Sequence, residues 1–255
     1  MIVSTDAIVL RSMKYGETSK IVTVYSQRYG KIKLMAKGAR SAKNKFGASL
    51  EPMTHSVMIL YRKEHRELHL LSKAEIVEPF LNLNDDSKKL AVGLAIVELV
   101  NMVMHDEEEN RPMYALLEAS LQAANETTAN VMNVLLAFEM RMCQIFGYGF
   151  SIDRCSVCGR DIVEDRQVDR AFLMLATGSA VCSVCHSRLH SGGIALSKGV
   201  VRAMVYLQSA ALDGMTALRL SSSSRDEILA TLFTYLRYHI EGVRTLKSLS
   251  LFNEV

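Results

Sequence analysis

The sequence lacks a hydrophobic run long enough to cross a membrane. The longest apolar stretch, LAVGLAIVELVNMVM at 90–104, is interrupted by Gly93, Glu98 and Asn101, whereas a spanning helix needs about 20 predominantly apolar residues. The first residues, MIVSTDAIVLRS, also lack the basic segment and apolar core of a secretory signal. We therefore predict a cytoplasmic protein that does not contact membranes.

Signatures of common catalytic sites are absent as well. We find no H-E-x-x-H, no G-x-S-x-G and no dinucleotide-binding fingerprint, and GETSK at 16–20 lacks the spacing of a phosphate-binding loop. Carboxylates cluster at Asp85–Asp86 and in DEEEN at 106–110. Both clusters fall between expected helices, where a solvated acidic loop is the ordinary explanation. The sequence predicts a binding protein rather than an enzyme, with no catalytic residue.

Residues 1–80 have the pattern of a β domain. Five stretches of alternating or β-branched residues, separated by short turns, leave no room for a crossover helix. A sheet this small usually closes to remove its edges. We predict a five-stranded β-barrel of the oligonucleotide-binding (OB) type, ending near Pro79.

From about residue 86 the hydrophobic period becomes helical. Helices are expected from Ser87, from Asn110, over 131–147, from Ser197, and from Ser224, which forms a capping box with Glu227. The helical pattern breaks over 151–194. We predict an α+β protein with a barrel domain at 1–80 and a helical domain at 81–255 that carries a small insertion at about 151–194.

The formal net charge of +3 hides an uneven distribution along the chain. Residues 1–80 hold fourteen Lys and Arg against seven Asp and Glu, a net of +7, and the remainder holds sixteen against twenty, a net of −4. A basic region of this kind is typical of proteins that bind a polyanion. A basic domain that is merely soluble is the alternative.

Basic side chains are concentrated in KIKLMAKGARSAKNKFG at 31–47, which contains no Asp or Glu. The first half alternates like a strand, and the second half is expected to be a flexible loop that can follow a phosphate backbone. The candidate contacts are Lys31, Lys33, Lys37, Arg40, Lys43 and Lys45. The aromatic candidates for base stacking are Tyr15, Tyr25, Tyr29 and Phe46, although Tyr25 also suits the barrel core.

Four of the five cysteines form two C-x-x-C pairs, and the pattern predicts a structural zinc site. The predicted ligands are Cys155, Cys158, Cys182 and Cys185. Two such turns complete a tetrahedron around Zn²⁺ and leave no position open for substrate. His186 and His190 are alternative ligands, and a pair of redox dithiols would need a βαβ context that is missing. Cys143 is expected to be a buried apolar residue.

Three segments resemble the RecO family of bacterial recombination mediators: YGETSKIVTVYSQRYGKIKLMAKGARSAKN at 15–44, FEMRMCQIFGYG at 138–149, and the two CSVC motifs. Lys37 and Arg40 match the KGAR of the family, so the resemblance implies that they contact DNA. Lys43 and Lys45 follow more loosely. Family members can carry arginines just before the FE of the third helix, where this chain has Leu136 and Ala137, with Arg141 one turn later.

The resemblance implies an OB barrel, a helical domain and a zinc insertion. It also implies binding of single- and double-stranded DNA, strand annealing, and partnership with RecR and with the acidic tail of the single-strand DNA-binding protein. RecA would be assisted indirectly, and the protein would be associated with the nucleoid. The main alternative is a zinc-containing OB-fold protein of translation or RNA metabolism, which preference for RNA over DNA would reveal. A nuclease would show metal-dependent turnover of nucleic acid. An adaptor protein with no nucleic-acid role would show no affinity for oligonucleotides.

Overall fold

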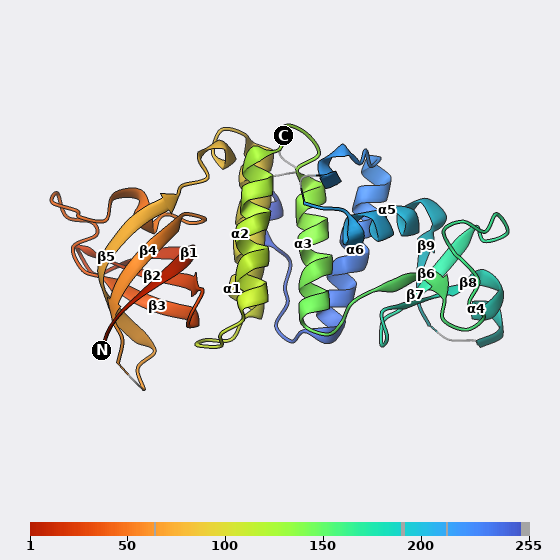
Figure 1. Cartoon of the computed structure of the whole chain (residues 1–255), viewed down its shortest axis with the longest axis horizontal. Helices are drawn as coiled ribbons and strands as arrows, with labels where there is room; N and C mark the ends of the chain where they lie inside the picture. Colours follow the sequence, from red (N-terminus) through yellow and green to blue (C-terminus); the bar gives the residue numbers. More distant parts are fainter. Residues whose placement is uncertain (64, 190–191, 213, 251–255) are drawn as a thin grey trace. The chain divides into compact units, whose positions relative to one another are not determined.

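The computed structural model describes residues 1–63, 65–189, 192–212 and 214–250 (Figure 1). The chain divides into two compact units. Unit 1 is Met1–Glu126 together with the segment that returns from Leu246, and unit 2 is Thr127–Thr245. Within the described residues, no helix combines the length and apolar character needed to span a bilayer.

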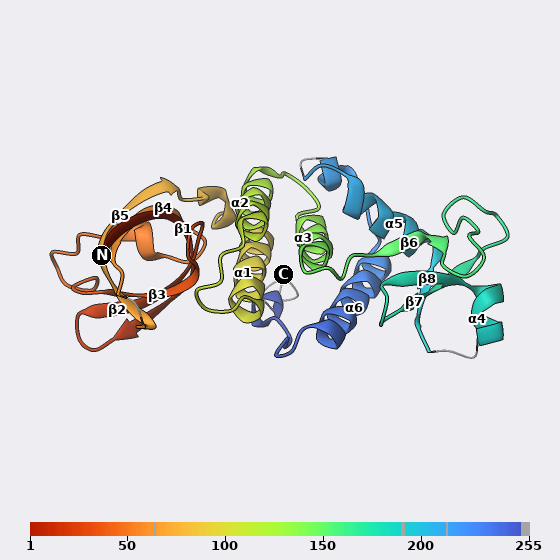
Figure 2. The same ribbon diagram turned by 60° about the horizontal axis from the view of Figure 1, so that its bottom comes forward.

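Unit 1 begins with a closed five-stranded barrel in the order β1-β2-β3-β5-β4, which confirms the expected fold. The strands are β1 (Ile2–Tyr15), β2 (Ser19–Ser26), β3 (Gly30–Ala36), β4 (His55–Tyr61) and β5 (Leu68–Glu78). The first half of β1 pairs with β4 and the second half with β2, with a change of register between Val9 and Arg11. Parallel pairing of β3 with β5 closes the barrel, and the strands curve around a common interior in Figure 2.

Two helices follow the barrel in unit 1, α1 (Ser87–Val103) and α2 (Arg111–Glu126). The N-cap of α1 is Asp86 rather than the expected Ser87, because the Asp86 carboxylate accepts from the backbone N–H groups of Lys88 and Lys89. Asn110 caps α2 by accepting from Met113 N at 2.9 Å. Short 3-10 helices lie at η1 (Gly47–Leu50) and η2 (Leu81–Leu83).

The chain returns to unit 1 near its end. A 3-10 turn, η4 (Lys247–Leu249), packs on α1. The carboxylate of Glu98 accepts from Lys247 N at 3.1 Å and from Ser248 N at 3.0 Å, and also from the Ser248 hydroxyl. A single side chain of α1 therefore holds this returning segment by its backbone.

Unit 2 combines helices α3 (Met132–Ile145), α5 (Lys198–Ser209) and α6 (Ser222–His239), and η3 (Gly214–Ala217), with a small sheet. The sheet has the order β6-β8-β7-β9. Its elements are β6 (Ser151–Cys155), β7 (Arg170–Met174), β8 (Ser179–Cys182) and β9 (Ile194–Ser197), with α4 (Ser183–Leu189) after β8.

The start of α6 differs from the expected capping box. Ser221 is the N-cap, since its hydroxyl accepts from Ser224 N at 3.1 Å. Glu227 instead accepts from Ser197 N at 3.1 Å, just before α5. Four consecutive serines offer equivalent caps, so packing rather than local sequence selects the helix start.

Candidate metal centre and nucleic-acid face

The four predicted cysteine ligands meet at one point of unit 2. Their Sγ atoms all lie within 4.8 Å of one another, and Cys158 Sγ and Cys182 Sγ are 3.9 Å apart. A tetrahedron with metal–sulfur bonds of about 2.3 Å has edges of about 3.8 Å. Cys155 ends β6 and Cys182 ends the adjacent β8, so the sheet brings the two C-x-x-C pairs together.

The backbone around Cys155 supports a charged sulfur. Gly159, with φ of 71°, allows its N–H to reach Cys155 O at 2.9 Å, which closes the first C-x-x-C turn. Burial raises the pKa of Cys155, but backbone N–H groups, first that of Cys182, outweigh it and bring the pKa to about 6.

The pKa of Cys185 shifts in the opposite direction to that of Cys155. Hydrogen bonding to the Cys158 side chain raises the pKa of Cys185 to about 12. Four thiols this close cannot all ionise unless a cation neutralises them. The cluster therefore fits a metal ion bound by four sulfurs.

Of the two alternative histidine ligands, the structure describes only His186, which is not part of this cluster. His186 stacks on Phe172, with ring centroids 3.6 Å apart and an interplanar angle of 3°. His190 lies outside the described residues. Cys143 is buried on α3, as expected, and burial together with Glu139 raises its pKa to about 12.

Apolar side chains follow one another around the outward face of the barrel, and we call this row the apolar ring, although its two ends, Met13 and Ile2, lie eleven residues apart on β1. Cross-strand partners face the same side of a sheet, and six exposed or half-exposed residues are successive partners around it: Met13, Ile21, Met35, Leu70, Tyr61 and Ile2. Sequence reasoning missed this ring, because alternation within one strand does not reveal which residues of other strands lie beside it. Tyr61, which is 42% exposed, is a base-stacking candidate that was not predicted.

The basic candidates divide into two groups beside this ring. Lys31 and Lys33 share the face of Met35 on β3, but both pair with Asp106, at 3.3 Å and 2.8 Å. The side chain of Lys31 is only 13% exposed and also donates to Asn101 O at 3.1 Å, whereas that of Lys33 is 40% exposed. Lys31 is therefore held inside the structure, and Lys33 is partly available to a ligand.

The remaining basic candidates lie beyond the end of β3 and are exposed. Arg40 Nη1 donates to Gly16 O at 3.1 Å in the β1–β2 turn. Lys45 Nζ donates to Ser72 O at 2.7 Å and lies 5.1 Å from the centroid of the Phe46 ring. Lys37 and Lys43 extend from the same segment. Together these side chains place positive charge beyond the end of β3, between the β1–β2 turn and β5.

The segment that carries them is anchored rather than the free loop expected. Ala39 and Phe46 are both buried in the barrel core, and Arg40 N donates to Thr18 O at 2.8 Å. The backbone that carries these cations is therefore fixed to the barrel. Because the Phe46 ring is buried, it cannot stack on a nucleobase.

The other three aromatic candidates differ in their exposure. Tyr25 is fully buried, as its alternative interpretation predicted, and Tyr29 is half-buried with the Arg62 guanidinium 4.9 Å from its ring centroid. Tyr15 is exposed. Of the four aromatic residues predicted to stack, only Tyr15 has its ring freely accessible.

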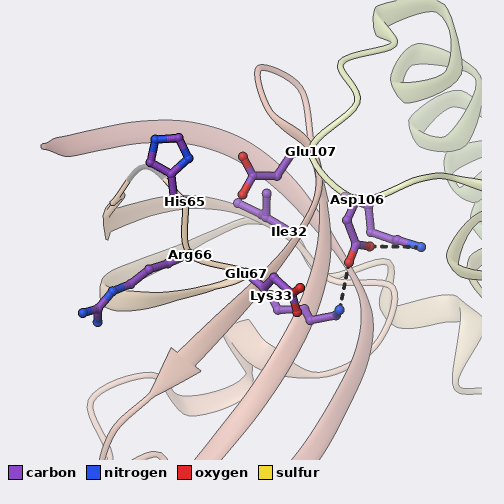
Figure 3. Close-up of a pocket in the computed structure, with 8 residues that line it drawn as sticks. Ile32, Lys33, His65, Arg66, Glu67, Asp106 and Glu107 are labelled. Atoms are coloured by element: carbon purple, nitrogen blue, oxygen red, sulfur yellow. Dashed lines mark hydrogen bonds and ion pairs between the residues drawn. The ribbon is translucent and has the colours of Figure 1, made fainter.

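The acidic stretch 106–110 is exposed at residues 106–109, as expected of a solvated loop, but its first two residues also pair with β3. Glu107 N donates to Lys31 O at 2.8 Å, and Lys31 and Asp106 form a parallel bridge. Glu107 pairs with Arg62 at 2.6 Å and with His69 at 3.2 Å. Beside these pairs is a cavity of about 440 Å³ that the turn 65–67 also lines (Figure 3). The turn before α2 thus brings carboxylates to the basic face.

Comparison with known proteins agrees with this architecture. The family models Recombination protein O N terminal and Recombination protein O C terminal match residues 1–80 and 84–250. DNA repair protein RecO of Salinibacter ruber is 34% identical, over 100% of this chain and 94% of that protein. DNA repair protein RecO of Chloroherpeton thalassium is 27% identical, over 100% and 99%. The resemblance inferred from three short segments extends over the whole sequence, and the chain belongs to the RecO family of DNA repair proteins.

Proposed function

We propose that this protein binds single- and double-stranded DNA on the outward face of its barrel and anneals complementary strands. With RecR, it helps load RecA on single strands covered by the single-strand DNA-binding protein. The observation that carries the proposal is the juxtaposition of the apolar ring with the exposed cations beyond β3. Phosphates would contact Lys37, Arg40, Lys43 and Lys45, and bases would stack on Tyr61 or Tyr15.

This combination suits single strands without sequence preference. Every base has a π-face, so stacking on aromatic or apolar side chains contributes about 1–3 kcal/mol per base for any sequence. Each neutralised phosphate releases counterions, which makes the affinity depend on salt. Shielding the phosphates of two strands lowers their repulsion and leaves the base edges free to pair, so annealing needs no covalent chemistry from the protein.

For the cysteine cluster we propose Zn²⁺ in a structural role. Four thiolates close the coordination sphere, so no position is left for water or substrate. The strands of the surrounding sheet are only four or five residues long. Metal binding would supply the stability that such a small core lacks.

We further propose that unit 2 binds the acidic tail of the single-strand DNA-binding protein. The support is the sequence pattern: α3 carries Met132, Met140 and Met142, and flexible apolar side chains suit a peptide with acidic and hydrophobic residues. All three are buried in the structure, so the peptide would have to contact other side chains of this unit first. Arg141 is not an obvious anchor, because its guanidinium donates to Ala210 O. Titration with the tail peptide, with and without its terminal aromatic residue, tests this; binding no stronger than that of a scrambled peptide would refute it.

Replacing Lys37 and Arg40 by alanine is expected to weaken binding to all DNA sequences alike. Two lost phosphate contacts should reduce the slope of log affinity against log salt by roughly 1.4 units on single strands, at about 0.7 per phosphate. Anisotropy titrations of a labelled oligonucleotide at several salt concentrations measure this slope.

The matched control is Lys88→Ala with Arg219→Ala, which removes the same charge from two exposed positions off the barrel. Thermal melting of both variants checks that the loss of the Arg40–Gly16 contact has not unfolded the barrel. An unchanged slope in the first variant would remove these two residues from the interface.

The activity itself is tested by annealing two complementary fluorescent oligonucleotides, bare or coated with single-strand DNA-binding protein, as DNA and as RNA. Acceleration on coated DNA supports the mediator function. Equal acceleration on RNA favours the alternative, an OB-fold RNA-binding protein. No acceleration on any substrate would contradict the annealing proposal.

A further inference from the structure

Two carboxylates occupy the side of the barrel face where phosphates would be expected. Asp106 holds Lys31 and Lys33, and Glu107 holds Arg62 and His69. All four cations or potential cations belong to β3, β5 or the β4–β5 turn. The adjacent backbone follows β3 through the bridge at Lys31. A negatively charged segment of this chain thus runs along a basic strand, as a nucleic-acid backbone would.

The geometry points to a built-in competitor: we propose that Asp106 and Glu107 mimic phosphates and keep part of the barrel face in a low-affinity state until a strand displaces them. The inference rests on the proposed DNA-binding function and assigns a regulation to that same face. Displacement exchanges one ion pair for another. A phosphate that replaces Asp106 at Lys33 therefore adds less affinity than a phosphate that binds an unpaired lysine.

The carboxylates are ionised but not deeply buried, as a displaceable competitor requires. Burial raises the pKa of Asp106, but Lys33 and Lys31 outweigh it and hold the pKa below its usual value. Burial likewise raises the pKa of Glu107, but Arg62 and His69 outweigh it and hold that pKa below its usual value. Their side chains are 44% and 36% exposed, and ion pairs that water can reach are weak.

The side chains can exchange without movement of the backbone. The segment packs closely on the turn at Gly30, where an added Cβ would lie 1.9 Å from Glu108 O. The cavity of about 440 Å³ beside Lys33 and Asp106 leaves room for an incoming group. In Figure 3 the Arg66 side chain points away from Asp106, whereas Glu67 lies beside Lys33. A phosphate that approaches Lys33 from the solvent side therefore also meets the charge of Glu67, and Asp106 together with Glu67 raises the pKa of Lys33.

Only two of the cations should become available when the carboxylates are neutralised. The side chains of Lys33 and Arg62 are 40% and 25% exposed, whereas those of Lys31 and His69 are 13% and 1% exposed. Asp106→Asn with Glu107→Gln should therefore steepen the salt slope on single strands by roughly 1.4 units. We expect binding at low salt to tighten by roughly tenfold.

Anisotropy titrations of a labelled oligothymidine at several salt concentrations measure both quantities. The control is Asp85→Asn with Glu109→Gln, which changes the net charge equally: Asp85 precedes α1, and Glu109 pairs with Arg111 at 2.7 Å. Thermal melting is recorded for every variant. A gain shared by the control would be a net-charge effect and would overturn the proposal.

Lys33→Ala provides a second readout. It should change affinity little in the wild-type chain, where Asp106 occupies Lys33, and remove about half of the gain in the Asp106→Asn, Glu107→Gln background. If the ion pairs of Asp106 and Glu107 serve only to stabilise the fold, the Asp106→Asn, Glu107→Gln variant melts at a lower temperature and gains no DNA affinity. That result overturns the proposal. If the Lys37→Ala, Arg40→Ala variant loses DNA affinity while the Asp106→Asn, Glu107→Gln variant gains none, the proposed competition by the carboxylates is wrong. The proposed DNA-binding function is then still supported. A wild-type chain without DNA affinity refutes both.

Discussion

Replacement of Cys155 by serine is expected to abolish metal binding and unfold the small sheet of unit 2 while the barrel stays folded. Cys155 connects the end of β6 to the cluster and accepts the N–H of Cys182. Because the sheet has short strands, we expect its order to depend on the metal site. Zinc in a four-ligand site of a small domain binds with apparent free energies of about 10–16 kcal/mol, which the folded state loses when the ion leaves.

Metal content by elemental analysis and hydrogen exchange of residues 151–189 measure the effect. Cys143→Ala is the matched control, because this cysteine is also buried but lies on α3, outside the cluster. A strong chelator should reproduce the effect of Cys155→Ser in the wild-type chain. Retention of one metal ion per chain and unchanged exchange in Cys155→Ser would contradict a four-cysteine structural site.

Glu139→Gln is expected to make unit 2 more stable at alkaline pH. Glu139 lies in the middle of α3 and is 4% exposed, and its Oε2 has no hydrogen-bond partner among the described residues. Burial raises its pKa from 4.5 to about 8. The folded state therefore keeps a proton that the unfolded chain releases above about pH 4.5.

The direction of the pH dependence follows from this difference in pKa between the folded and the unfolded chain. The contribution of Glu139 is most favourable below pH 4.5, declines as the unfolded chain ionises, and levels off above pH 8. Between pH 5 and pH 8 the wild-type chain should lose stability on the order of 4 kcal/mol from this residue, at about 1.4 kcal/mol per pKa unit. Glutamine has a similar shape and does not titrate, so the variant should lose none of it.

Urea unfolding followed by hydrogen exchange in α3, at pH 5 and pH 8, measures the free energy of unfolding of this unit. Glu241→Gln, an exposed carboxylate beyond α6, serves as the control and should leave the pH dependence as it is. Parallel stability profiles for Glu139→Gln and wild type would mean that Glu139 is charged or hydrogen-bonded in the folded state.

Local patterns predicted the strands of the barrel and the two C-x-x-C turns, because both are encoded by residues close in sequence. Alternation identifies strands one at a time, and a C-x-x-C turn positions two thiolates by itself. The helix starts were less accurate: Asp86 and Ser87 are both good caps, as are Ser221 and Ser224. The choice between neighbouring caps depends on packing, which the local sequence does not contain.

The acidic segment shows where sequence reasoning fails. Asp106 and Lys33 are 73 positions apart, and nothing in DEEEN distinguishes a solvated loop from one that pairs with β3. The apolar ring is hidden for the same reason, since Met35 and Tyr61 become neighbours of Leu70 only through strand register. Features made by long-range pairing need the three-dimensional structure.

The hold of Glu98 on Lys247 and Ser248 has a consequence for dissecting this protein. Unit 1 is made from two stretches of sequence, and unit 2 is spliced between them. A fragment that stops at residue 126 lacks the donors of Glu98 and leaves that carboxylate unsatisfied. The barrel-bearing half should therefore be produced with residues 246–250 fused behind residue 126 through a short linker, or as a circular permutant. A protease cut near residue 127 should give two pieces that co-purify, because the clamp on α1 still joins them.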